Sequence, residues 1–324
     1  MPGFRSHYVF GIESRNILKK LNTPESLSMW DVVRSHPAVY ALGQQGPDIF
    51  FYNPLSYTHK RNTGEIMHHD RTLAFITNLI KVSESINDPG LRGVAHAYTA
   101  GFIGHYTMDT TCHPYIHYRT KKNINDHSNR SFYNHMFLEA DIDCALLAHY
   151  LKLRPSEFIP SKTIELSQAD AILIGSLIQR AADMTYPDMV LVSFEVTQAF
   201  RFTRIVYDLM EDRNKWKKKL VRSFEDDFLK HPQFSAMIAN DGHKTYTDPC
   251  NLRHLEWKNP WDLTHHSRAS FYELFASAEK KYIRRLYLYF CLFSSECGSR
   301  DYFSYVDMLK NDLSNLSYDS GLAL

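Results

Sequence analysis

The sequence has few cysteines, no long apolar run and no surplus of charge of either sign, and each of these absences excludes a class of protein. Its 324 residues contain five cysteines, an odd number, and no CxxC pair. A disulfide framework is therefore not expected, and a reducing compartment is predicted. No stretch of 18 apolar residues occurs, so no transmembrane segment is expected. A formal net charge of +1 gives no strong attraction to nucleic acid, and no stable nucleic-acid partner is expected.

The first residues, MPGFRSHYVF, also lack the apolar segment of a signal peptide. Together with the scattered cysteines, this favours a cytoplasmic location.

Apolar residues recur at helical spacing along most of the chain, and no alternating, strand-like run is convincing, so an all-α fold is predicted. Helices are expected over 6–22, 70–87, 91–113, 130–152, 162–184, 190–230 and 267–295. Pro114 should end the third of these, since proline lacks the N–H that continues a helix. Loops are expected over 43–66, 114–129, 153–161 and 232–264, which hold most of the Pro, Asn and Gly.

The histidines are unevenly distributed, because 12 of the 17 lie in the first 150 residues. Histidine is the commonest metal ligand among the side chains that titrate near neutral pH. The first half of the chain is therefore the place to look for a metal site.

The main signal is the segment HYTMDTTCH, in which His105, Asp109 and His113 are spaced by four residues. Residues four apart lie on the same face of a helix, so His105 and Asp109 can bind one ion. His113 lies a further turn along and could serve another ion. Zinc accepts such nitrogen and oxygen donors.

A second pair, His135 and Glu139, has the same spacing on the next predicted helix. A single HxxxD or HxxxE pair is more often a surface hydrogen bond or a helix cap. Two such pairs on consecutive helices favour a metal site.

Three residues upstream are weaker candidates when each is taken alone. His7 opens the first predicted helix, Asp48 follows the rigid pair Gly46-Pro47, and His68 lies just before another predicted helix. A single histidine at a helix start is usually a cap or a core side chain.

Taken together, the order His, Asp, His, HxxxD, His, HxxxE resembles the zinc-dependent phospholipase C family, which is related to the S1/P1 nucleases. The matching stretches are SHY at 6–8, GPD at 46–48, MH at 67–68, GHYTMD at 104–109, CHP at 112–114 and the segment 135–139. The start of the chain, QGPDIFFY and HPYI are similar to a bacterial subgroup of this family.

The resemblance implies a multi-helix bundle like that of phospholipase C and P1 nuclease, with a buried cluster of two or three zinc ions. By position, His68, His105, Asp109 and Asp48 would hold one zinc, and His113, His135 and Glu139 a second. His7 and a bridging Asp109 would hold a third, completed in the family by the N-terminal amine. Here that amine would belong to Pro2, after removal of Met1. His69 and His117 are the alternatives to His68 and His113.

The resemblance also implies hydrolysis of a phospholipid or another phosphodiester by a zinc-activated water. Asp48 is the candidate catalytic residue that orients or deprotonates this water. One alternative is a single-strand nuclease or 3′-nucleotidase, with Phe50, Phe51 and Tyr52 stacking on bases. Another is a zinc-stabilised binding protein without turnover.

The predicted loop over 232–264 leaves two domain arrangements open. A metal-binding helical core over 1–155 could carry a C-terminal helical part over 156–324 that packs on it. Alternatively, the chain forms a single domain in which this loop is functional, as long loops often are. In that loop, Trp257 and Trp261 are expected to be core or lid aromatics.

Overall fold

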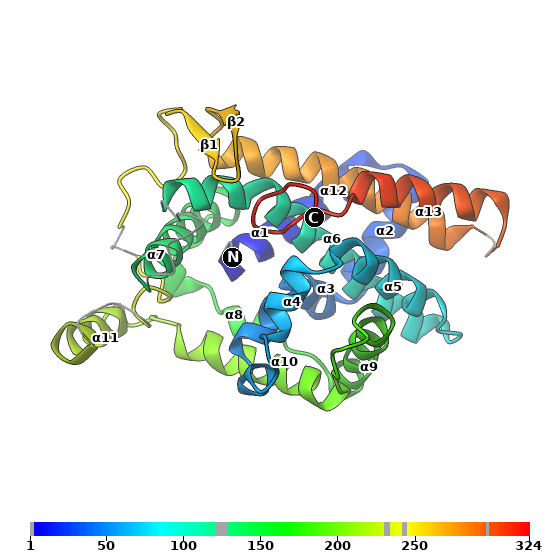
Figure 1. Ribbon diagram of the computed structural model, residues 1–324, viewed down its shortest axis with the longest axis horizontal. Helices are drawn as coiled ribbons and strands as arrows, with labels where there is room; N and C mark the ends of the chain where they lie inside the picture. Colours follow the sequence, from blue (N-terminus) through cyan, green and yellow to red (C-terminus); the bar gives the residue numbers. More distant parts are fainter. Residues whose placement is uncertain (1–2, 121–128, 230–233, 242–244, 296–297) are drawn as a thin grey trace.

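A computed structural model describes residues 3–120, 129–229, 234–241, 245–295 and 298–324, which form packed helices and one small hairpin (Figure 1). The α-helices are α1 (Phe4–Leu21), α2 (Pro24–Ser35), α3 (Pro37–Gly43), α4 (Thr63–His69), α5 (Thr72–Glu84), α6 (Pro89–Arg119), α7 (Asn129–Leu146), α8 (Pro160–Thr163), α9 (Gln168–Thr185), α10 (Ser193–Leu209), α11 (Lys217–Phe224), α12 (Phe271–Ser294) and α13 (Arg300–Leu313). Shorter 3₁₀ or π segments are η1 (Gly46–Tyr52), η2 (Pro54–Tyr57), η3 (Leu147–Leu151), η4 (Pro155–Glu157) and η5 (Glu225–Leu229). The predicted all-α class is confirmed.

The central helix is α6, which is 31 residues long and buried almost continuously from Val94 to His117. Asp88 caps its first turn by accepting a hydrogen bond from the backbone N–H of Leu91 at 2.8 Å. Helices α3, α5 and α12 pack around it. A helix buried on all sides is stabilised by packing more than by its own propensity.

The prediction that Pro114 ends this helix was wrong, because α6 continues to Arg119 with Pro114 inside it. Proline removes one backbone hydrogen bond, but the residues that follow it, Tyr115 and Ile116, are fully buried and hold the next turn in place. The extra turn keeps His117 on the helix, one turn beyond His113.

Two close backbone contacts bring α3 against the middle of α6. A Cβ atom on Gly43 would lie 2.3 Å from the carbonyl oxygen of Tyr98, and one on Gly101 would lie 2.4 Å from that of Tyr40. Only glycine allows this approach at both positions. As a result, the residues that follow α3 lie against the face of α6 that carries His105.

Other boundaries differ from the predicted ones. The helix expected over 190–230 is divided into α10, α11 and η5, because the side chain of Asp212 accepts hydrogen bonds from the backbone N–H of Lys217 and Lys218 and starts a new helix. The predicted loop over 43–66 contains η1, η2 and the start of α4. Helices α2, α3 and α13 were not predicted.

The predicted loop over 232–264 contains β1 (Trp257–Asn259) and the start of β2 (Asp262–Ser267), which pair as an antiparallel hairpin. The expectation of no strand was therefore wrong. Residues 121–128 of the predicted loop over 114–129 lie outside the described residues, as do 230–233 and 242–244.

Asp143 of α7 fixes the start of α1. Its carboxylate accepts hydrogen bonds from the backbone N–H of Ser6 at 2.8 Å and of Arg5 at 3.3 Å, and its Oδ2 lies 3.8 Å from the Arg5 guanidinium. The side chains involved are buried. Helix α1 therefore enters the molecule beside α7 and α6, and Figure 1 shows both chain ends close to this region.

In the described part of the chain, no helix combines the length and the apolar character needed to cross a bilayer.

Candidate metal centre

Helix α6 presents His105, Asp109, His113 and His117 at intervals of four residues along one face, and all four are buried. Side chains at this spacing stack above one another on a helix. The other elements that reach this face are α1, η1, α4, α7 and the segment after α13.

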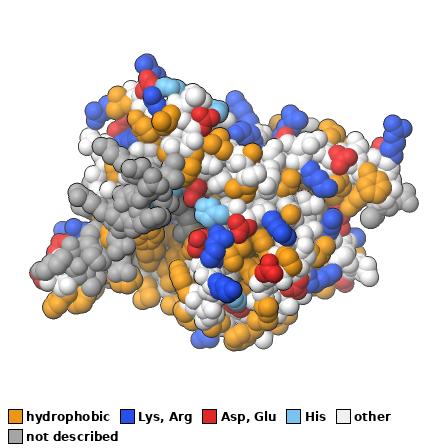
Figure 2. Space-filling view, viewed as in Figure 1, with side chains coloured by type: hydrophobic (Ala, Val, Ile, Leu, Met, Phe, Trp, Pro, Cys, Tyr) orange, Lys and Arg blue, Asp and Glu red, His pale blue; other side chains and the backbone are white. Residues whose placement is uncertain are grey.

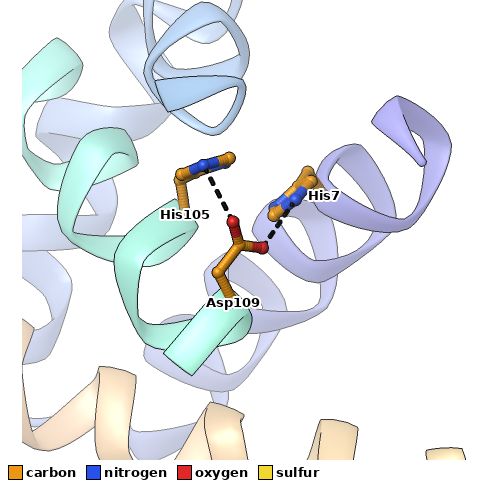
Figure 3. A group of neighbouring side chains, drawn as sticks. All are labelled: His7, His105 and Asp109. Atoms are coloured by element: carbon orange, nitrogen blue, oxygen red, sulfur yellow. Dashed lines mark ion pairs between the residues drawn. The ribbon is translucent and has the colours of Figure 1, made fainter. Parts of the chain in front are cut away.

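In the first group, the carboxylate of Asp109 directs one oxygen at each of two imidazole rings (Figure 3). Its Oδ1 is 3.2 Å from Nε2 of His7, and its Oδ2 is 3.2 Å from Nε2 of His105. The two rings stack with their centroids 4.3 Å apart. Each oxygen of Asp109 thus faces one imidazole nitrogen, and the three side chains form one candidate metal position.

The second group joins Asp48, His68 and His105. Oδ1 of Asp48 lies 3.1 Å from Nε2 of His68 and 3.8 Å from Nε2 of His105. Gly46 begins η1 with φ +51°, and a Cβ atom there would lie 2.2 Å from the ring of His105. Glycine is therefore required where the chain carries Asp48 over this ring. His68 lies just before α5, as expected, but it also belongs to the last turn of α4, a helix that was not predicted.

The third group contains His113, His135 and Glu139. Oε1 of Glu139 lies 2.7 Å from Nε2 of His135 and 3.9 Å from Nε2 of His113. His135 and Glu139 come from α7, whereas His113 comes from α6. The donor atoms within each of the three groups lie within 4.8 Å of one another, close enough to surround one ion.

The tautomers of three histidines follow from the partners of their Nδ1 atoms, which are backbone carbonyl oxygens. These oxygens belong to Gln44 for His105, Gly64 for His68 and Tyr318 for His113, at 3.0, 2.6 and 3.0 Å. A carbonyl only accepts hydrogen bonds, so each Nδ1 carries the proton and each neutral ring keeps a lone pair on Nε2. Hydrogen bonds of this kind orient histidines that bind metals.

These lone pairs face carboxylate oxygens, which are also acceptors. Nε2 of His68, His105 and His113, together with Oδ1 of Asp48 and both carboxylate oxygens of Asp109, are buried without a hydrogen-bond partner among the described residues. Buried polar atoms are normally paired, and facing acceptors repel each other. A cation between them removes this conflict, so the donor set fits zinc.

The pKa shifts of the histidines also indicate a position that favours a cation. Burial lowers the pKa of His7 and lowers that of His113 well below its usual range, so both are neutral near pH 7. Burial opposes protonation of His105 as well, but the carboxylates of Asp109 and Asp48 outweigh it and raise the His105 pKa. A proton at His105 therefore competes with a metal for the same position.

The carboxylates differ in the same way. Burial raises the pKa of Glu139 well above its usual range. Burial acts in the same direction on Asp109, but His105, His113 and His7 outweigh it and hold the Asp109 pKa well below its usual range. Of these two carboxylates, Asp109 is therefore the more readily ionised.

The segment after α13 also contributes to the centre, although no pattern in the sequence predicted this. The carbonyl of Tyr318 binds Nδ1 of His113, and the ring of Tyr318 lies 4.7 Å from that of His68. Oδ1 of Asp319 lies 3.2 Å from Nε2 of His117. No spacing pattern could link residues so far apart in the sequence.

His113, His117 and Asp319 form a fourth group with donor atoms at metal-binding distances. This group would use Nδ1 of His113, 3.8 Å from Oδ1 of Asp319, but that atom donates to the Tyr318 carbonyl. Because this hydrogen bond occupies Nδ1, only Nε2 of His113 remains available as a metal ligand, and it faces His135 and Glu139. His117 and Asp319 therefore face each other beside the third group.

All eight residues predicted as metal ligands lie in the three groups. Of the alternatives, His69 lies 3.8 Å from Asp319, and His117 joins the fourth group in addition to His113. Met1 and Pro2, predicted to complete one site, lie outside the described residues. Trp257 is buried against Tyr115, and Trp261 lies edge-on to His117 with the ring centroids 4.8 Å apart.

A cavity opens beside the second and third groups. Asp48 and Glu139 supply its carboxylates, and Tyr52 and Met136 supply apolar wall. It is also lined by Gly3, Phe4, Gln45, Ala140, Asp143, Tyr207, Met210 and Met237. The free space of this cavity therefore borders carboxylates of both groups.

The fold and the site define a helical protein with a buried centre of histidines and carboxylates suited to several metal ions. A family model described as zinc dependent phospholipase C matches residues 6–189. The chain belongs to this family of phospholipase C-like zinc hydrolases, which confirms the resemblance found in the sequence. Comparisons with curated proteins and with solved structures gave no match.

Proposed function

We propose that the protein hydrolyses the phosphodiester bond between the glycerol and the head group of a phospholipid. The observation that carries this proposal is the convergence of three groups of buried, mutually facing donor atoms beside one cavity. Zinc held by these groups would polarise the phosphoryl group and activate a water as the nucleophile. Two or three ions are proposed, with Asp109 shared between His7 and His105.

Asp48 is the proposed catalytic residue. It lines the cavity, and its Oδ1 faces His68 at 3.1 Å. From this position the carboxylate can orient an attacking water and accept its proton. This one carboxylate could thus serve both as a metal ligand and as the group that orients and deprotonates the water.

The group of His113, His135 and Glu139 is proposed to receive the leaving oxygen. Glu139 of this group lines the same cavity as Asp48, which belongs to another group. The carbonyl of Tyr318 holds the ring of His113 in the required orientation. Charge that develops on the departing oxygen would be stabilised there.

The aromatic residues of η1 argue against a nuclease. Phe50 is buried, Phe51 packs on the ring of His68, and Tyr52 packs edge-on against Tyr207. Stacking of nucleic-acid bases needs exposed aromatic faces beside a basic groove. Of these three side chains, Tyr52 lines the cavity and provides part of its wall, which suits a lipid.

The test is zinc analysis of the purified protein by mass spectrometry, together with assays on phosphatidylcholine, on the soluble ester p-nitrophenyl phosphorylcholine and on single-stranded RNA. The variant is His105→Gln, and the matched control is His96→Gln, which changes a buried histidine of the same helix outside the centre. We expect zinc and hydrolysis of both choline esters in the wild type and the control, and loss of both in the variant. A zinc-containing protein that cleaves none of these substrates would instead be a zinc-stabilised binding protein.

A further inference from the structure

A stripe of large apolar side chains, which we call the α11 stripe, lies on the surface of α11 and η5. Trp216, Leu220, Phe224 and Phe228 follow one another at intervals of four residues and are 53, 60, 56 and 71% exposed. The rings of Phe224 and Phe228 lie 4.8 Å apart. Figure 1 shows α11 projecting from the lower left of the molecule, and Figure 2 shows hydrophobic side chains gathered on that projection.

The opposite side of this segment carries charged groups and faces the protein. Lys218 is buried, with its ammonium 5.8 Å from the centre of the Phe137 ring. Glu225 is fully buried and accepts hydrogen bonds from the backbone N–H of Ser235 at 3.0 Å and from the Ser235 hydroxyl. If the α11 stripe turned inward, the charged groups of Lys218 and Glu225 would lose their partners, which costs free energy. The stripe is therefore held facing outward.

The segment lies next to the candidate metal centre. Phe137, beneath Lys218, belongs to α7 and lies between His135 and Glu139 in the sequence. Met210 and Met237, which flank the segment in the sequence, both line the cavity that contains Asp48 and Glu139. The segment that carries the α11 stripe is thus joined at both ends to the wall of this cavity.

The chemistry of the stripe fits a lipid surface. Trp216 lies at its start, where an exposed indole ring can meet lipid head groups. The phenylalanines and Leu220 can then enter the acyl boundary, as in interfacial amphipathic helices. Over 215–229 the chain carries four lysines and one arginine against three acidic residues, a net charge of +2, so apolar contact is the main attraction and charge adds only a little to it.

We propose that the α11 stripe inserts into a phospholipid surface and brings the cavity with Asp48 and Glu139 against its substrate. This proposal rests on the proposed function in one respect, since it takes the lipid to be the substrate. Within the described residues no helix can span a bilayer, so the attachment is peripheral.

The test compares the full-length, zinc-loaded protein with the double variant Phe224→Ser, Phe228→Ser. The matched control is Phe194→Ser, Phe303→Ser, which changes two exposed phenylalanines on α10 and α13. Binding is measured by cosedimentation with phosphatidylcholine vesicles made from a phosphonate analogue that resists hydrolysis. Rates are measured on phosphatidylcholine vesicles and on soluble p-nitrophenyl phosphorylcholine.

We expect the double variant to lose vesicle affinity by about 100-fold, roughly tenfold for each large apolar side chain that no longer enters the lipid. Its hydrolysis of vesicles should fall in parallel, while its zinc content and its rate on the soluble ester stay unchanged. The control should match the wild type in every assay.

Vesicle binding by the double variant equal to that of the wild type would overturn the proposal, as would a wild type that does not bind vesicles. Loss of a dimer in light scattering, without a change in vesicle binding, would assign the stripe to a second copy of the chain. Vesicle binding does not require turnover, so a protein that binds through the stripe but cleaves neither ester would refute the proposed function alone.

Discussion

Nδ1 of His113 lies 3.0 Å from the carbonyl oxygen of Tyr318, a residue 205 positions further along the chain. This hydrogen bond makes the end of the chain part of the candidate metal centre. The segment is fixed on both sides of it, because the Tyr106 hydroxyl donates to the carbonyl of Ser314 at 2.8 Å and the Asn259 amide donates to that of Ser320 at 2.8 Å. The orientation of His113 therefore depends on a segment that the family match does not include.

The first prediction concerns Gly321, which has φ +63° and whose backbone is pressed against α6. A Cβ atom there would lie 2.2 Å from the carbonyl oxygen of Thr110. Gly321→Ala should therefore displace the segment, release His113, and weaken zinc binding by about 10–100-fold, as loss of an orienting hydrogen bond does. Chelator titration monitored by bound zinc measures this change.

The matched control is Gly298→Ala. Gly298 also has a positive φ, +85°, but no atom lies within 4 Å of a Cβ placed there. The Gly298→Ala variant should lose stability only through the backbone conformation that alanine disfavours, and its zinc affinity should be unchanged. Equal zinc affinity in the two variants would show that the end of the chain does not position His113.

The sequence predicted the residues of the metal centre that lie close together along the chain, but not those that lie far apart. His105, Asp109 and His113 could be placed together because a helix brings every fourth residue to one face. Tyr318 and Asp319 could not, because only the packing of the last segment on α6 brings them there. The predicted end of the helix at Pro114 was wrong because burial of the following turn outweighs the low helix propensity of proline.

The α11 segment illustrates the same limit. The helical pattern over 190–230 was correctly predicted as helical, but the break depends on Asp212, which hydrogen-bonds the first N–H groups of α11. The pattern could not reveal that the apolar side faces outward, because the partners of Lys218 and Glu225 come from other parts of the chain.

The second prediction concerns Asp109. Asp109→Asn removes the negative charge shared by His7 and His105, whose Nε2 atoms lie 3.2 Å from its two oxygens. We expect loss of at least one zinc per chain, and a fall in phosphodiester hydrolysis of about 100-fold or more, since each site holds a single ion and the reaction depends on the metal. Zinc content and initial rates measure both effects.

Glu195→Gln serves as the control for this substitution. Glu195 is also a buried carboxylate, but it lies 3.0 Å from His59 and outside the three groups. It should keep the zinc content of the wild type. If Asp109→Asn retained as much zinc as Glu195→Gln, Asp109 would not be a ligand.

The third prediction separates the role of Asp48 from metal binding. The amide of Asp48→Asn keeps an oxygen that can face His68 and His105 but cannot accept a proton. We expect kcat to fall by about 10²–10⁴-fold with a small change in KM and at most a modest loss of zinc. Steady-state kinetics on the soluble ester, with zinc content measured in the same samples, distinguish this result from a simple loss of metal. An unchanged kcat would remove Asp48 from the mechanism.

The last prediction concerns His96, a buried histidine of α6 outside the metal centre. Its Nδ1 is hydrogen-bonded to the hydroxyl of Tyr289 at 2.6 Å, and its ring stacks on Phe293. Burial lowers the pKa of His96 to about 4, below the usual value of 6.5, with a smaller contribution from Arg92. Between these two pKa values, the unfolded chain binds a proton that the folded chain does not.

The free energy of unfolding should therefore fall as the pH decreases from 6.5 towards 4, and His96 should account for about 2 kcal/mol of this loss by pH 5. His96→Gln retains a hydrogen-bonding group but cannot be protonated, so its stability should decline less steeply over this interval. Urea unfolding of the two chelator-treated proteins at pH 7 and pH 5 measures the difference. Because the other buried histidines are common to both proteins, their effects cancel, and stability curves that stay parallel across this interval would show that His96 does not titrate on unfolding.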